Sequence, residues 1–171
     1  CAKDASKEET AVSMIKVENL TFSYDSSFDY IFENADFQID TDWKLGFVGR
    51  NGRGKTTLLN LLLGKYEYTG KILSSVQFDY FPYPVTDRGR MTEEILKDVC
   101  PQAEEWEIMR ELSCLDVSAE VLWRTFETLS KGEQTKVLLA ALFLNDGHFL
   151  LIDEPTNHLD AAAREKTAEY L

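Results

Sequence analysis

The sequence predicts an α/β fold, and three observations support this class. A glycine-rich stretch, residues 49–54, lies between an apolar segment and a run of leucines, which is the pattern of a strand, a tight loop and a helix. Residues 14–24 and 35–39 alternate between apolar and polar types, as strands do. A short apolar run, residues 149–152, ends in two carboxylates, as a buried parallel strand beside a ligand site does.

Composition and charge narrow the class of protein. The chain has 171 residues, 44% of them hydrophobic and 12% aromatic, which is enough for a folded core. A net charge of −12 disfavours nonspecific binding to nucleic acid or to anionic lipid. No apolar run approaches the length that spans a membrane. The cysteines number three and lack metal-ligand spacing, which indicates reduced thiols in a cytosolic protein.

The first part of the chain predicts strands joined by turns. Residues 1–13 are polar and aperiodic, so we expect a tail or a cloning remnant there. A strand follows over residues 14–24 and ends in a turn at residues 25–27. A second strand covers residues 35–39, and another turn leads into a third strand at residues 43–48, which feeds the glycine-rich loop.

The middle of the chain predicts a helix end, two strands and two helices. Gly64 has the position of a C-terminal cap for the leucine-rich helix. Strands are expected at residues 70–73 and 76–81, where prolines end the second one. Thr92 is the expected N-cap of an acidic helix, and Pro101 the expected start of the next one. Their many carboxylates fit a solvated face better than a metal site.

The glycine-rich stretch and the residues after it have the composition of a phosphate-binding loop. Glycines allow a tight turn that points successive N–H groups inward, and the following helix adds its positive N-terminal end. Lys55 would reach the β- and γ-phosphates, and the Thr56 hydroxyl would ligate Mg²⁺. The spacing G-x4-G-K-[ST] is complete. The nine residues are Gly49, Arg50, Asn51, Gly52, Arg53, Gly54, Lys55, Thr56 and Thr57.

Positive charge gathers at the loop within an otherwise acidic chain. Lys44, Arg50, Arg53 and Lys55 form a local basic cluster, which suits a small polyanion better than a long one. For Arg50 and Arg53, scattered positions on a solvated surface remain an equally reasonable interpretation. For Lys55 that alternative is weak.

An aromatic residue lies shortly before the loop at the expected end of a strand. Tyr24 could stack its ring on a nucleotide base, or it could be a half-buried strand residue. Four neighbouring aromatics compete for the stacking role, so spacing alone leaves the choice open. They are Phe22, Phe28, Tyr30 and Phe32.

Asp153 and Glu154 follow directly after the last apolar strand. Asp153 is suited to hold Mg²⁺, directly or through water, and Glu154 to orient and polarise a water that attacks the γ-phosphate. The alternative is that the pair caps a helix that begins near Asp160. An apolar strand ending in Asp-Glu together with a phosphate loop is rarer than either feature alone, which favours the catalytic interpretation.

Residues 129–134 open an apolar helix with a second glycine-containing segment. Ser130 and Glu133 have the S-x-x-E spacing of a capping box. A helix N-terminus that carries serine and glycine also suits a phosphate. The two interpretations are compatible.

These motifs together resemble an ATP-binding cassette (ABC) protein from residue 14 to the end of the chain. Residues 49–57 resemble the Walker A motif, residues 129–133 the family signature (usually LSGGQ), and residues 149–154 the Walker B motif. Residues 157–160 resemble the D-loop. The resemblance implies a P-loop NTPase core with an antiparallel β subdomain and a short helical subdomain over about residues 86–130, truncated at the C-terminus.

The resemblance also assigns roles to single residues. It implies ATP and Mg²⁺ as cofactors, Tyr24 as the adenine-stacking aromatic, and Asp160 as the D-loop acid. Two cassettes of the family sandwich two ATP molecules head to tail, so the signature contacts the ATP of the opposing cassette. The residues implied by position are Glu154 and Lys55 for catalysis, Thr56 and Asp153 for the metal, and Ser130, Lys131, Gly132 and Glu133 for the signature.

Residues 153–160, together with Glu133, are similar to the ABC-F branch of the family. Members of this branch are soluble, cytoplasmic tandem-cassette proteins that act on the ribosome. Several stretches look like the antibiotic-resistance members, which protect against lincosamides, streptogramin A and pleuromutilins. The resemblance implies a second cassette and the ribosome as partners, with no membrane insertion and no direct DNA binding.

Three features depart from the family pattern. Lys131 replaces the first signature glycine. The glutamine of the family's Q-loop is matched in position by Tyr83, whereas Gln77 is too early. The chain ends at Leu171, before the family's switch histidine and second cassette, which indicates a fragment with little or no turnover of its own. Two other functions remain open: an ATPase subunit of a membrane transporter, and an interaction module that binds ATP without hydrolysing it.

Overall fold

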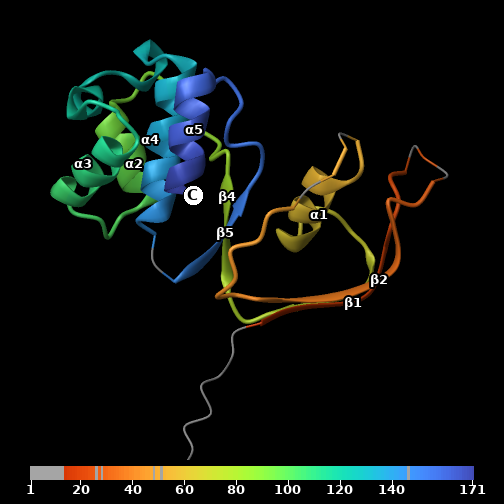
Figure 1. Cartoon of the computed structure of the whole chain (residues 1–171). Coiled ribbons are helices and arrows are strands. Elements are labelled where there is room, and N and C mark those ends of the chain that lie inside the picture. The colour runs from red at the N-terminus through yellow and green to blue at the C-terminus, as the bar shows by residue number, and fades with distance from the viewer. Residues whose placement is uncertain (1–13, 26, 28, 48, 51, 146) are drawn as a thin grey trace, which may run out of the picture. The chain divides into compact units, whose positions relative to one another are not determined.

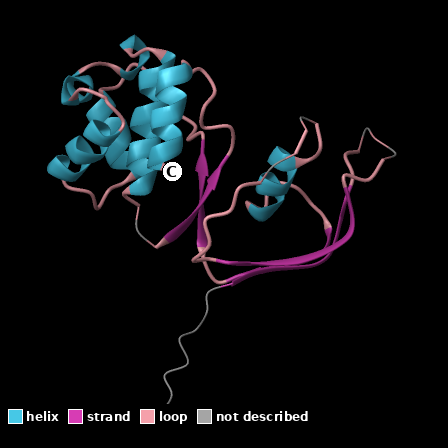
Figure 2. Ribbon diagram, viewed as in Figure 1, coloured by secondary structure: helices cyan, strands magenta, loops and turns pink. Residues whose placement is uncertain are grey.

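The computed structural model describes residues 14–25, 27, 29–47, 49, 50, 52–145 and 147–171. The chain divides into two compact units, which meet in the sequence between Gln77 and Phe78. The part up to Gln77 is named the first unit, and the part from Phe78 to Leu171 the second unit. Strands make up most of the regular structure in the first unit, and helices most of it in the second (Figure 2).

A three-stranded antiparallel sheet forms the frame of the first unit. The strands β1 (Met14–Phe22), β2 (Phe32–Asp40) and β3 (Thr69–Ser74) lie in the order β2-β1-β3. Figure 1 labels β1 and β2 of this sheet. Val17 of the central strand pairs with Phe37 of β2 on one side and with Ile72 of β3 on the other. The strands predicted at residues 14–24, 35–39 and 70–73 are therefore confirmed as β1, β2 and β3.

The central strand contains a bulge that changes its side-chain alternation. Ile15 and Val17 are buried before the bulge, and Leu20 and Phe22 after it, so the buried side chains are no longer two residues apart. Asn19 has φ 50° at this point, and the register of both pairings shifts there. An extra residue in one strand keeps the apolar side chains on one face across the irregularity.

The strand predicted at residues 43–48 is not formed among its described residues. Trp43, Leu45 and Phe47 are all exposed, and no residue from Trp43 to Phe47 belongs to a strand. Val48 lies outside the described residues. A strand gains its stability from paired neighbours rather than from its own sequence, so apolar alternation alone does not form one.

Helix α1 (Lys55–Leu62) follows the glycine-rich loop, and its C-cap residue is Leu63, so the predicted capping glycine, Gly64, is the first residue beyond the cap. Gly64 has φ 68°, and its N–H donates to the carbonyl of Leu61 at 3.0 Å. The N–H of Lys65 donates to the carbonyl of Asn60, also at 3.0 Å. This pair of bonds is the Schellman arrangement, which requires the left-handed conformation that glycine adopts without strain.

The second unit contains helices and a two-stranded sheet. Its strands are β4 (Gln77–Phe81), which begins at the last residue of the first unit, and β5 (His148–Ile152). Its α-helices are α2 (Thr92–Val99), α3 (Glu105–Cys114), α4 (Lys131–Phe143) and α5 (Ala161–Tyr170). Two short 3₁₀ segments, η1 (Ala119–Trp123) and η2 (Phe126–Thr128), join α3 to α4.

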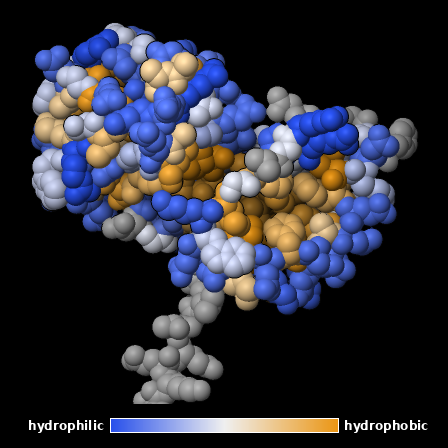
Figure 3. Space-filling model, in the orientation of Figure 1, coloured by the Kyte–Doolittle hydropathy of each residue, from blue (hydrophilic) through white to orange (hydrophobic). Residues whose placement is uncertain are grey.

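One apolar cluster holds the helices of the second unit together. Phe126, Leu122, Leu112 and Leu139 are almost completely buried within it. Hydrophilic residues cover much of the visible face of this unit in Figure 3. None of the helices in the described part of the chain has both the length and the apolar character that crossing a membrane requires.

Three expected details of the second unit are wrong. Thr92 is the first residue of α2 rather than its cap, because its buried hydroxyl donates to the carbonyl of Arg124 at 2.8 Å. The next helix begins at Glu105, not at Pro101, and Glu104 caps it with a capping box. Strand β5 was expected to be fully buried, but only Leu151 is.

Candidate functional site

The glycine-rich loop adopts left-handed backbone conformations at two glycines. Gly52 has φ 79° and Gly54 has φ 85°, values that residues with a Cβ rarely adopt. A Cβ at Gly54 would lie 2.6 Å from the side-chain methyl carbon Cγ2 of Ile31, whereas no atom lies within 4 Å of one at Gly52. Glycine is therefore required at position 54 both by backbone conformation and by space. Asn51 lies outside the described residues.

Lys55 folds back over this loop. Its ammonium group donates to the carbonyl oxygen of Gly49 at 2.8 Å and to that of Arg50 at 3.3 Å. Gly54 caps α1 without a side chain, and the first turn of the helix contains no acidic residue. The loop therefore gathers a lysine cation and the positive end of a helix dipole, the two features that an anion needs.

The remaining loop residues differ in exposure. Arg53 is exposed. Thr56, which follows Lys55 in the first turn of α1, is exposed as well. Thr57 is buried at 7% exposure. The hydroxyl oxygen of Thr56 and the carboxylate of Asp153 are hard ligands of the kind that Mg²⁺ prefers, so their chemistry fits the predicted metal.

Tyr24 lies just beyond the end of β1 and contacts the start of α1. Its hydroxyl shares a hydrogen bond of 2.8 Å with the hydroxyl of Thr57. Its ring packs edge to face with Phe22, at a centroid distance of 5.0 Å, and with Tyr66, at 5.7 Å. The phenol of Tyr24 and burial together raise the pKa of Tyr66, so Tyr66 is neutral at physiological pH.

The competing aromatics occupy other positions. Phe32 lies against the place where Gly54 would carry a Cβ, and Tyr30 is exposed. Phe28 lies outside the described residues. Sequence reasoning missed Tyr66, because 42 positions separate it from Tyr24 and no local pattern joins them.

Asp153 follows β5 and forms two hydrogen bonds with strand β4, one as a donor and one as an acceptor. Its backbone N–H donates to the carbonyl of Phe81 at 2.9 Å, and Tyr80 donates its hydroxyl to the Asp153 carboxylate at 3.1 Å. Burial and the nearby negative charge of Asp153 raise the pKa of Tyr80 to about 12. Tyr80 therefore remains a proton donor to this carboxylate across the physiological range.

Glu154 is exposed and adopts φ 50°, which is uncommon for a residue with a side chain. Asn157 donates its side-chain amide to the Glu154 carboxylate at 2.5 Å and its backbone N–H to the Glu154 carbonyl at 3.1 Å. The alternative that residues 153–154 cap the next helix is wrong. Asp160 caps α5, where its carboxylate accepts from the N–H of Ala163 at 2.8 Å.

The predicted capping box at the start of α4 is confirmed. The N–H of Ser130 donates to the Glu133 carboxylate at 2.7 Å, and the N–H of Glu133 donates to the Ser130 hydroxyl at 3.2 Å. The backbone hydrogen bond from Ser130 lowers the pKa of Glu133. Lys131 is exposed in the first turn, and Gly132 is half-buried.

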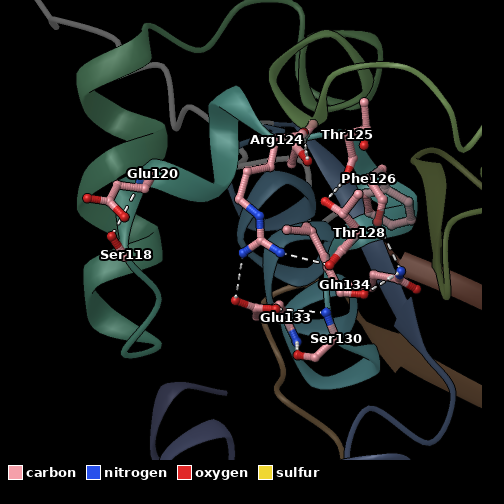
Figure 4. Close-up of polar contacts among 11 residues, drawn as sticks. Ser118, Glu120, Arg124, Thr125, Phe126, Thr128, Ser130, Glu133 and Gln134 are labelled. Carbon is pink, nitrogen blue, oxygen red and sulfur yellow. Dashed lines mark hydrogen bonds and ion pairs between the residues drawn. The ribbon is translucent and has the colours of Figure 1, made fainter.

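A polar frame surrounds this helix start, as Figure 4 shows. Arg124 donates to the carbonyl of Thr128 at 2.7 Å and pairs with Glu133 at 3.6 Å. The buried side-chain amide of Gln134 donates to the carbonyls of Phe126 and Leu129, at 3.0 and 2.9 Å. These bonds tie the segment before the helix to the helix itself.

Sequence reasoning missed this frame. Arg88 donates to the side-chain carbonyl of Gln134. The one local signal was the position of Gln134, which lies three and four residues before Val137 and Leu138 and so falls on the buried face of α4. A polar residue on a buried face needs hydrogen-bond partners, but the sequence does not say which.

The structure gathers the predicted residues into two groups, one in each unit. In the first unit it brings Lys55 to the loop and Tyr24 to Thr57. In the second unit it brings Asp153 to Tyr80, and Ser130 to Glu133. Of the two residues considered for the Q-loop, Gln77 is exposed at the start of β4, and Tyr83 packs partly buried against the core of the second unit.

Known proteins similar to this chain include members of one family. The family model described as "ABC transporter" matches residues 32–157. A Schizosaccharomyces pombe protein described as an uncharacterized ABC transporter ATP-binding protein is 35% identical, over 92% of this chain and 27% of its own length. The ribosome protection protein VmlR of Bacillus subtilis is 30% identical, over 95% of this chain and 30% of its own. ABC transporter F family member 5 of Arabidopsis thaliana is 29% identical, over 93% and 24%.

The chain thus spans less than a third of the length of each of these relatives. Solved structures show the same fold. An ABC transporter ATP-binding protein structure from Pyrococcus furiosus matches with a TM-score of 0.79 and 24% identity, over 92% of this chain and 83% of that one. A bacterial Atm1-family ABC exporter with ATP bound matches with a TM-score of 0.76 and 18% identity, over 93% and 32%.

Proposed function

The chain belongs to the ABC transporter family, and we propose that it binds ATP with Mg²⁺ and hydrolyses it as the first cassette of an ABC-F protein. The observation that carries the proposal is the loop ahead of α1, where the ammonium group of Lys55 lies over the backbone at Gly49. A cation and a helix N-terminus without a side-chain cap, both at one loop, favour a polyphosphate.

In the proposed function, each of the residues named from the sequence motifs has a defined part in binding. The backbone N–H groups of residues 49–54 and the ammonium group of Lys55 bind phosphate oxygens. Tyr24 stacks on the adenine. Thr56 and Asp153 are the residues that would hold Mg²⁺, which when bound neutralises charge on the phosphates during transfer.

Glu154 is the proposed general base. Its carboxylate accepts a proton from a water whose oxygen bonds to the γ-phosphorus, while the bond from that phosphorus to the bridging oxygen breaks and ADP leaves with the electron pair. The exposed carboxylate, held by Asn157 at 2.5 Å, supports this role because water reaches it and its position is restrained.

The signature segment is assigned to a second nucleotide. Ser130, Lys131, Gly132 and Glu133 would contact ATP bound by an opposing cassette, with Asp160 nearby in the D-loop. Such a site requires a partner cassette, so we propose that the chain acts head to tail with the second cassette of its parent protein. Turnover by the 171-residue chain alone should be low.

The ribosome is the proposed site of action. VmlR, 30% identical to this chain, is named a ribosome protection protein, and another relative is an ABC transporter F family member. The name of VmlR supports a protein that acts on the ribosome. From the resemblance to the ABC-F branch we further propose that the protein is cytoplasmic and protects the ribosome from antibiotics. Ribosome binding of the parent protein, measured by cosedimentation with and without ATP, tests this part.

Equilibrium binding tests the nucleotide site directly. We expect the chain to bind ATP in the presence of Mg²⁺, measured by titration calorimetry, and Lys55→Ala to abolish binding because it removes the cation from the loop. Lys71→Ala, which removes an exposed lysine of β3 in the same unit, is the matched control and should bind as the wild type does. Equal binding by the wild type and by Lys55→Ala would contradict the assignment.

A second substitution separates hydrolysis from binding alone. In the two-cassette parent protein, Glu154→Gln should lower phosphate release by about a hundredfold or more while ATP binding persists, because the amide cannot accept the proton. Unchanged phosphate release would favour a nucleotide-dependent interaction module instead.

A further inference from the structure

We propose that Tyr66 and Thr57 are positioning residues of the nucleotide site, which hold the ring of Tyr24 in the orientation that receives the base. The inference rests on the proposed function and extends it to the choice between a nucleotide and a bare polyphosphate. All of the residues that carry it lie in the first unit.

The hydroxyl of Tyr24 is the first of the contacts that hold its ring. It shares a 2.8 Å hydrogen bond with Thr57, which lies in the first turn of α1 directly behind Lys55 and Thr56. Thr57 is buried, so the bond is partly buried and its Thr57 end is shielded from competing water. Stacking on a base requires only an aromatic face, which phenylalanine supplies equally well. The hydroxyl therefore has a separate purpose, which is to tie the base-binding ring to the helix of the phosphate loop.

Two further rings restrain the plane of Tyr24. Its centroid lies 5.0 Å from that of Phe22 at 81°, and 5.7 Å from that of Tyr66 at 82°. Phe22 and Tyr66 are themselves stacked, with centroids 5.5 Å apart at 27°. Tyr24 is thus held by edge-to-face contacts with both members of a stacked pair, distances and angles that such contacts favour.

The three rings come from different places in the unit. Phe22 is the last residue of β1, where it is buried, whereas Tyr66 follows the end of α1. Tyr24 and Tyr66 remain 36% and 37% exposed, so a ligand can reach them. A ring that is ordered before the ligand arrives loses less conformational freedom on binding, which raises affinity without any new contact to the ligand.

The positioning contacts should affect a base and not a phosphate chain. Their loss should weaken ATP binding and leave inorganic tripolyphosphate, which lacks a base, unaffected. A general loss of structure in the first unit would weaken both ligands equally. The ratio of the two affinities therefore separates positioning from stability.

The experiment measures the dissociation constants of Mg²⁺ complexes of ATP and of tripolyphosphate by titration calorimetry, with the full 171-residue chain. Tyr66→Ala should weaken ATP binding roughly three- to tenfold, because it removes two ring contacts, and should not change tripolyphosphate binding. Tyr66→Phe keeps both rings in contact and should restore ATP binding. Tyr30→Ala, at an exposed tyrosine outside the trio, is the matched control and should change neither constant.

Tyr24→Phe provides an independent test, because it keeps the aromatic face and removes only the hydroxyl. If stacking were the whole role of Tyr24, this variant would bind ATP as the wild type does. We expect Tyr24→Phe to weaken ATP binding severalfold and to leave tripolyphosphate binding unchanged. Adding Tyr66→Ala to Tyr24→Phe should weaken ATP binding less than adding it to the wild type, because both changes release the same ring.

Three results would overturn the inference. The first is an unchanged dissociation constant for ATP in both Tyr66→Ala and Tyr24→Phe. The second is an equal loss of affinity for ATP and for tripolyphosphate. The third is ATP binding by Tyr66→Phe that is as weak as that of Tyr66→Ala. Lys55→Ala distinguishes these from a failure of the proposed function. If Lys55→Ala and the wild type bind ATP alike, the nucleotide site itself is wrongly placed and the inference falls with it.

Discussion

The apolar segment at residues 43–47 of the first unit and the apolar core of the second unit differ in how far their side chains are buried. In the first unit, Trp43, Leu45 and Phe47 are each more than half exposed, and none is in a strand. In the second unit, Leu139 is completely buried and Phe126 is 2% exposed. Hydrophobic side chains also reach the visible surface of the first unit (Figure 3).

The structures that formed as predicted depend on local interactions. The αL glycines and the Schellman end of α1 form in the first unit, as the capping box of α4 does in the second, and all of these depend on residues a few positions apart. A strand depends on neighbours that are distant in sequence. The segment at residues 43–47 contributes apolar side chains without such pairing, whereas the helices of the second unit supply one another with a shared core.

Two phenylalanines, one in the core of the second unit and one in the exposed segment of the first, should differ most in their effect on stability. Phe126→Ala should lower the free energy of unfolding of the second unit by about 3–5 kcal/mol, because it leaves a cavity in a closed core. Phe47→Ala should change that of the first unit by about 0.5 kcal/mol or less, because the side chain is already exposed. Urea unfolding measured by hydrogen exchange of peptides from each unit reports the two separately.

A large loss in Phe47→Ala would contradict the exposed state of residues 43–47. Leu45→Ala, from the same segment, tests whether that result is general. If both variants destabilised the first unit by more than about 2 kcal/mol, a paired strand would be the better description of this segment.

What the sequence predicted correctly was mostly local. The spacing of Ser130 and Glu133 was sufficient to predict a capping box, and Gly64 sufficient to predict a helix end, because each involves one turn of backbone. The alternation of residues around Ile15 and Phe37 predicted β1 and β2. Their antiparallel pairing follows from a short connection, which brings the second strand back beside the first.

What it did not predict depends on residues far apart in the chain. Thr92 has the chemistry of an N-cap, yet it donates to Arg124, 32 positions away, and enters the helix instead. The bond between Tyr24 and Thr57 spans 33 positions. Sequence periodicity names the residue types that face a core or a ligand, but it does not say which of them meet.

The second prediction compares two glycines of the phosphate loop. Gly52→Ala should destabilise the first unit by about 1–2 kcal/mol, the usual cost of a side chain in the left-handed region. Gly54→Ala should destabilise the first unit by at least about 1 kcal/mol more than Gly52→Ala does, because its Cβ would also lie 2.6 Å from the Cγ2 of Ile31. Hydrogen exchange of peptides from the first unit, measured during thermal unfolding, gives the two free-energy changes.

The double variant Gly54→Ala with Ile31→Ala supplies the control. Shortening Ile31 removes the methyl carbon in question, so adding Gly54→Ala to Ile31→Ala should cost less than Gly54→Ala costs in the wild type, with the 3.3 Å contact to Phe32 remaining. Equal losses in Gly52→Ala and Gly54→Ala within the wild-type background would show that space around the loop is not limiting.

The smallest predicted effect concerns the capping box of the second unit, where pH provides the test. The hydrogen bond from the Ser130 N–H lowers the pKa of Glu133 below its ordinary value of 4.5, so the folded state binds this proton less readily than the unfolded chain does. The ionised carboxylate therefore stabilises the second unit above about pH 5, and this contribution is lost as pH falls through the lowered pKa. Glu133→Gln should cost about 1 kcal/mol or less at pH 7, because glutamine keeps the box but not the charge, and nothing below about pH 3. Glu127→Gln, at an exposed position outside the box, should show no such pH dependence in the same urea titrations. A constant difference between Glu133→Gln and the wild type from pH 7 to pH 3 would mean that shape and not charge maintains this helix start.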